Sequence, residues 1–87
     1  MPRETKYELT ENVSAVLTVR AMTSQIVVKG GYSDEAPLGW ALVIGDRMVR
    51  RGLTPQITVK EGDDFATITL NGGGIAGIID ECVCEVL

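Results

Sequence analysis

The chain has 87 residues, enough for one domain (1–87) with a thin core, and its 45% hydrophobic content argues against disorder. The chain has a net charge of −4 and so lacks the excess of Lys and Arg that binding to nucleic-acid phosphates needs, which disfavours nucleic acid as a partner. We find no signal-peptide or membrane-span pattern, and two cysteines cannot supply a secreted disulfide framework, so we expect a cytoplasmic protein without a membrane partner.

The first half of the chain predicts a β-hairpin followed by a helix. Residues 1–6 resemble a frayed N-terminus. Apolar residues alternate with polar ones from Val13 to Val19, as in a half-buried strand, and a turn at 22–24 leads into a β-branched strand at 25–29. Gly30 and Gly31 end this hairpin.

Residues 33–52 contain helix boundary signals at both ends. Ser33 can cap the first amides, Gly52 suits the left-handed position after the last turn, and Pro55 prevents continuation. An apolar stripe at helical spacing predicts the buried face: Leu38, Ala41, Leu42, Gly45, Met48 and Val49. The alternative is a hairpin that turns at 45–46 after a buried strand at 40–44, which would give an all-β fold.

The second half repeats this order. Strands are expected at 56–60 and 65–70, around a turn at 61–64. After Gly72, Gly73 and Gly74 comes a second helical stripe, made of Ile75, Ile78, Ile79, Cys82, Val83 and Val86.

The sequence Leu17-Thr18-Val19-Arg20 recurs as Ile57-Thr58-Val59-Lys60, and both hairpins end in glycines. A period near forty residues indicates one supersecondary unit used twice, at 13–52 and 56–87. We therefore predict an α+β fold of duplicated ββα units, with a four-stranded antiparallel sheet and two helices on one face. The uncovered sheet face and the two edges favour a homodimer or another protein partner.

The chain contains no histidine, and its acidic residues are scattered, so we predict that it is not an enzyme. The segment 72–77 matches the dinucleotide pattern G-x-G-x-x-G, but the chain ends before the required acidic residue. A weaker alternative remains, in which two glycine corners bind a small molecule, nucleotide or anion. These corners consist of Gly30, Gly31, Gly72, Gly73 and Gly74. Cys82 and Cys84 are too few ligands for structural zinc, so no metal or cofactor is expected.

Arg47, Arg50 and Arg51 form the one local basic cluster, and Trp40 lies across the predicted helix from its apolar stripe. A large aromatic side chain outside the buried stripe is typical of a protein interface. We therefore predict a non-enzymatic interaction or regulatory protein (an inhibitor, adaptor or accessory factor) that binds a macromolecular partner through Trp40 and these three arginines.

Overall fold

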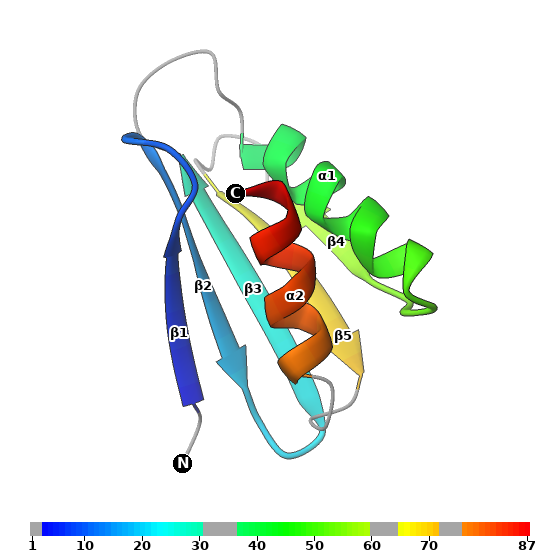
Figure 1. The fold of residues 1–87 in the computed structure, drawn as a ribbon. Helices are drawn as coiled ribbons and strands as arrows, with labels where there is room; N and C mark the ends of the chain where they lie inside the picture. Colours follow the sequence, from blue (N-terminus) through cyan, green and yellow to red (C-terminus); the bar gives the residue numbers. More distant parts are fainter. Residues whose placement is uncertain (1–2, 31–36, 60–64, 72–75) are drawn as a thin grey trace.

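A computed structural model describes residues 3–30, 37–59, 65–71 and 76–87. Their fold is α+β, with a five-stranded antiparallel sheet in the order β1-β2-β3-β5-β4 and two helices (Figure 1). The elements are β1 (Arg3–Glu8), β2 (Val13–Val19), β3 (Thr23–Gly30), α1 (Pro37–Arg50), β4 (Gln56–Val59), β5 (Phe65–Asn71) and α2 (Ala76–Val86). Both helices lie in front of the sheet in Figure 1, so they cover the same face.

Strand β1 corrects the prediction of a frayed N-terminus and of only four strands. It pairs with β2 along its whole length, from Arg3 opposite Val19 to Glu8 opposite Ser14. Tyr7 is the one buried residue of β1. With a single buried residue, the strand has no apolar alternation for sequence reasoning to detect, and it is held by its pairing with β2.

Helix α1 confirms the helical interpretation of residues 39–51, so the hairpin and the all-β alternative are wrong. The described helix begins at Pro37, and the expected cap at Ser33 lies outside the described residues. At the other end, Gly52 has φ of 82°, and its amide donates to the Val49 carbonyl while that of Leu53 donates to Met48. These two bonds form a Schellman motif, which satisfies the last carbonyls of the helix.

The buried face of α1 differs from the predicted stripe. The helix buries Ala41, Ile44, Gly45 and Met48, whereas Leu38, Leu42 and Val49 are exposed. Apolar residues surround most of this helix, so the sequence alone could not fix which side meets the sheet. In α2, Ile79, Cys82 and Val83 are buried as predicted, Val86 is partly buried, Ile78 is exposed and Ile75 lies outside the described residues.

The core lies between the sheet and the two helices. Its buried residues come from β1, β2, β3, β5, α1 and α2: Tyr7, Val13, Ala15, Leu17, Ile26, Val28, Ala41, Ile44, Met48, Ala66, Ile68, Leu70, Ile79, Cys82 and Val83. The opposite sheet face is half-buried and rich in hydroxyl groups, with Val16 opposite Val27 near its centre. Thr67 continues that row on β5.

One row of the sheet contains residues that the predicted repeat aligns, Leu17 with Ile57 and Ile26 with Ile68. Leu17 on β2 lies opposite Ile26 on β3, Ile26 lies opposite Ile68 on β5, and Ile68 lies opposite Ile57 on β4. Strands β3 and β5 are therefore adjacent, with β2 and β4 on their outer sides.

Candidate functional site

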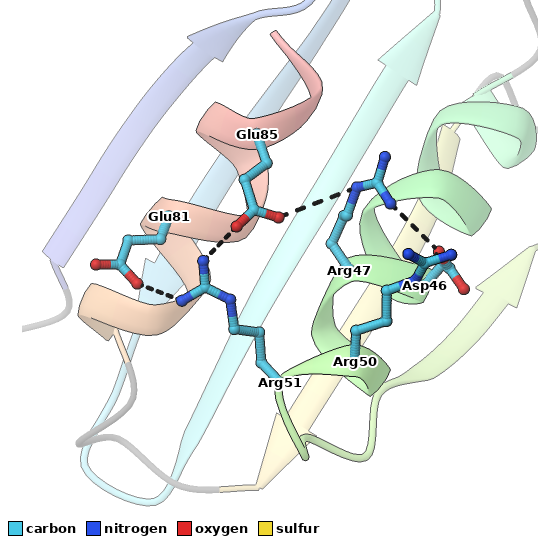
Figure 2. A network of polar contacts seen from close by, with 6 residues as sticks. All are labelled: Asp46, Arg47, Arg50, Arg51, Glu81 and Glu85. Atoms are coloured by element: carbon cyan, nitrogen blue, oxygen red, sulfur yellow. Dashed lines mark hydrogen bonds and ion pairs between the residues drawn. The ribbon is translucent and has the colours of Figure 1, made fainter.

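The predicted basic cluster joins the two helices. The Arg51 guanidinium donates to Glu81 Oε2 at 2.6 Å and also bonds Glu85, and both acids lie on α2 (Figure 2). Arg47 approaches the same Glu85 carboxylate, at 4.0 Å from Nε to Oε2. The hydrogen bonds that Arg51 donates to Glu85 and then to Glu81 raise the pKa of Arg51 above its already high usual value, so it stays charged.

Arg50 points away from α2 and pairs within its own helix. Its Nε lies 3.0 Å from Asp46 Oδ2, and Arg47 is 3.7 Å from the same oxygen (Figure 2). The three arginines thus face three carboxylates, those of Asp46, Glu81 and Glu85. The cluster is locally neutral, and its geometry accounts for the arginines without an external partner.

Trp40 is half-buried and packs against the hydrophobic core. It lies seven residues before Arg47, about two helical turns, so both residues are on the side of α1 that faces α2. The structure therefore brings Trp40 and Arg47 to one side of the helix, while Arg50 lies on another. Arg47 shares Asp46 with Arg50 and shares Glu85 with Arg51, so the three predicted arginines belong to one network in which each already has an acidic partner.

The exposed apolar residues of α1 lie on the other side. Leu38 lies nine residues before Arg47, and Val49 lies nine residues after Trp40. Nine residues are about two and a half helical turns, which places each pair on opposite sides of the helix. Leu38 and Val49 therefore point away from α2. Leu42 lies one turn from Leu38 on the same stripe. The exposed fractions of these side chains are 39% for Leu38, 54% for Leu42 and 59% for Val49.

This stripe borders the edge strand β4. An added Cβ at Gly45 would lie 3.0 Å from Ile57 Cδ1, which shows how closely α1 approaches β4. Val59 is on the same side of the sheet as Ile57, two residues along the strand, and it is 45% exposed. We name Leu38, Leu42, Val49 and Val59, together with the outer edge of β4, the α1–β4 face.

The two edges of the sheet differ sharply in charge. Strand β1 has the sequence Arg-Glu-Thr-Lys-Tyr-Glu, whereas β4 reads Gln-Ile-Thr-Val and has no charged residue. Among the described residues, no strand pairs with the outer edge of either one. Charged side chains protect an edge from pairing with another chain, so β1 has a protection that β4, which is short but uncharged, lacks.

A second candidate site is a cleft of about 330 Å³ between β1, β2 and α2, which is of the size that small ligands occupy. Its lining is Arg3, Thr5, Tyr7, Leu17, Val19, Gly77 and Asp80. The Tyr7 hydroxyl donates to Asp80 Oδ1 at 2.5 Å. Burial first, and then this hydrogen bond, raise the pKa of Tyr7 well above its usual value. The cleft therefore combines a cation, a carboxylate and an apolar floor.

Of the five glycines in the predicted corners, Gly30 lies within the described residues. Gly30 is the last residue of β3 and is half-buried, while Gly31, Gly72, Gly73 and Gly74 lie outside the described residues. Cys82 is buried and Cys84 exposed, both as free thiols, and burial raises the pKa of Cys82. Within the described parts of the chain, no group of three or more His, Cys, Asp or Glu side chains could hold a metal ion.

None of the helices in the described ranges is long and apolar enough to cross a membrane. Comparison with known protein families, with curated proteins and with solved structures finds no match for this chain.

Proposed function

We propose that this chain is a non-enzymatic interaction protein that docks another protein on the α1–β4 face. The observation that carries the proposal is the juxtaposition of an exposed apolar stripe with an uncharged strand edge. A partner strand added to β4 would satisfy the free backbone groups of that edge, and its neighbouring apolar side chains would cover Leu38, Leu42 and Val49. An inhibitor, adaptor or accessory factor acts in this way, by presenting a surface.

The docking residues proposed here differ from the partner-binding residues that the sequence suggested. Trp40 supports the core, and Arg47 and Arg51 are engaged with α2, so they fix the orientation of α1. Their contribution to docking is then indirect, since they hold the helix whose opposite side meets the partner. Of the three arginines, Arg50 has the most exposed side chain, at 69%, and such a charge at the rim acts on the rate of encounter.

The proposal is tested with three immobilised forms of the protein in native extract: wild type, Leu42→Glu and Val43→Glu. Val43 is a matched control, because it is also on α1 and 45% exposed but lies about 100° around the helix from Leu42. A docked protein should be retained by wild type and by Val43→Glu, and lost with Leu42→Glu. Equal retention by all three forms would contradict the proposal.

The cleft beside Tyr7 favours a second candidate function, the binding of a small molecule or anion. Gly77 lines this cleft, and an added Cβ there would meet no atom within 4 Å. A Gly77→Leu side chain therefore meets no clash and adds bulk to the lining of the cleft, with Gly77→Ala as the control. If inorganic phosphate or a nucleotide raises the melting temperature of Gly77→Ala but not of Gly77→Leu, the cleft is a ligand site. No shift in either variant would exclude these ligands.

We also propose that the fold arose from two ββα units, 13–52 and 56–87, with β1 added to the first. The row Leu17, Ile26, Ile68 and Ile57 supports this, because a two-fold axis between β3 and β5 would place equivalent residues symmetrically in that way. The buried positions of the helices also correspond: Ala41, Ile44 and Gly45 share their spacing with Ile79, Cys82 and Val83. Two free thiols support the cytoplasmic location that we expect.

A further inference from the structure

We infer that the α1–β4 face binds a second copy of this chain, with β4 pairing antiparallel to β4 of its partner. This inference rests on the proposed function, since it names an occupant for the same face.

The face presents two different surfaces side by side, an open strand edge and an apolar helix stripe. A single extended peptide could pair with the edge but would leave much of the stripe uncovered. A second copy offers both surfaces at once, because a two-fold axis that pairs β4 with β4 also brings the two α1 stripes together. The resulting contact places apolar side chains of one α1 against those of the other.

Charge favours this face over the opposite edge of the sheet, which is β1. Each copy has a net charge of −4, so two copies repel over most of their surfaces. Strand β4 is uncharged, and the nearest charged pair on α1, Asp46 with Arg50, is neutral as a pair. At the opposite edge, Arg3, Glu4, Lys6 and Glu8 would have to lose their hydration if β1 paired with another strand.

The size of the face sets the strength of the dimer. Helix α1 has 14 residues and is about 21 Å long, and with the strand edge the face is roughly 20 Å wide. This gives roughly 400 Å² per copy and about 800 Å² in total, which is below the ~1,200 Å² that stable specific interfaces bury and falls among weak, transient ones. The dimer is therefore weak and reversible, and at low concentration the face stays open to other proteins.

The test is the mass measured by light scattering from about 1 to 500 µM, for wild type, Leu42→Glu, Val59→Lys and the control Val43→Glu, under reducing conditions so that Cys84 cannot cross-link. We expect wild type and Val43→Glu to shift from monomer to dimer across this range, with Leu42→Glu and Val59→Lys at least tenfold weaker. Adding salt should strengthen the wild-type dimer, because salt screens the repulsion between acidic copies.

Two results would overturn the inference. One is a wild-type protein that remains monomeric at 500 µM, and the other is a dimer that Leu42→Glu and Val59→Lys leave intact while they remain folded by circular dichroism. Either result removes the second copy as the occupant. The proposed function has its own test, the binding experiment in native extract. It fails if no protein in the extract is retained by Val43→Glu and lost with Leu42→Glu.

Discussion

The hydroxyl of Tyr7 donates a 2.5 Å hydrogen bond to Asp80 Oδ1, across 73 residues of sequence. It joins β1, the strand that the sequence did not reveal, to α2, the last helix of the chain. Because Tyr7 is the one buried residue of β1, this bond and the burial of its ring are what attach the strand to the helical layer.

Tyr7→Phe should cost about 1 kcal/mol of unfolding free energy at neutral pH, the usual value of one hydrogen bond. The pKa of Tyr7 is raised from its ordinary 10.0, so the folded protein keeps a proton that the unfolded chain loses above about pH 10. The stability that comes from keeping Tyr7 protonated is complete below pH 10. It falls as the pH rises beyond 10, with a slope of up to about 1.4 kcal/mol per pH unit. Urea titrations at pH 8 to 11.5 should show a steeper loss in wild type than in Tyr7→Phe. Parallel curves would mean that Tyr7 does not hold its proton in the folded state.

Truncation to Ala should affect stability at Trp40 and self-association at Leu42. Trp40 packs against the core and is half-buried, so Trp40→Ala should lower the unfolding free energy by about 2 kcal/mol, roughly half the cost at a fully buried site. Leu42 is 54% exposed, so Leu42→Ala should change stability little and weaken self-association instead. Denaturant midpoints and light scattering on the same two samples separate these effects. A stable Trp40→Ala variant that no longer associates would restore Trp40 as the interface anchor.

The two cysteines should differ in reactivity. Cys82 is fully buried with a raised pKa, while Cys84 is exposed, and the thiolate is the reactive form. A colorimetric thiol reagent should therefore modify one thiol per chain in buffer and two in denaturant. Cys84→Ser should then show no fast reaction. Two fast thiols in the native wild-type protein would place Cys82 outside the core.

Ile26 and Ile68 test the two-unit origin of the fold. Both are fully buried, they lie opposite each other, and the proposed repeat pairs them with one another. If their surroundings are also equivalent, Ile26→Ala and Ile68→Ala should each cost about 2–5 kcal/mol and should differ by less than about 1 kcal/mol. Urea unfolding gives both values. A gap of more than about 2 kcal/mol would show that the two halves pack differently.

Six of the seven elements in the described ranges could be predicted from the sequence, because each has a local signal. The strands β2 and β5 alternate, Gly52 ends α1, and the stripe of α2 is regular. Strand β1 has no such signal, since four of its six residues are charged and its structure depends on pairing with β2.

The candidate site was harder to predict than the fold. Helix α1 is apolar on most sides, so the buried side is decided by its contacts with β3, β4, β5 and α2 rather than by its own pattern. The arginine cluster was a true feature of the sequence, but its acidic partners Glu81 and Glu85 lie 30 residues or more away. The contrast in charge between β1 and β4 is visible in the sequence and could have predicted which edge is open to pairing. It does so only when both strands are known to be edges of the sheet.

Amide hydrogen exchange at two protein concentrations, about 10 µM and 1 mM, tests the α1–β4 face most directly. If two copies pair through β4, outward-facing amides of Gln56–Val59 should exchange more slowly at the higher concentration, because they gain hydrogen-bond partners. Amides of Arg3–Glu8 should exchange at the same rate at both concentrations. Rates in β4 that do not depend on concentration, or protection that appears at β1 instead, would contradict the account.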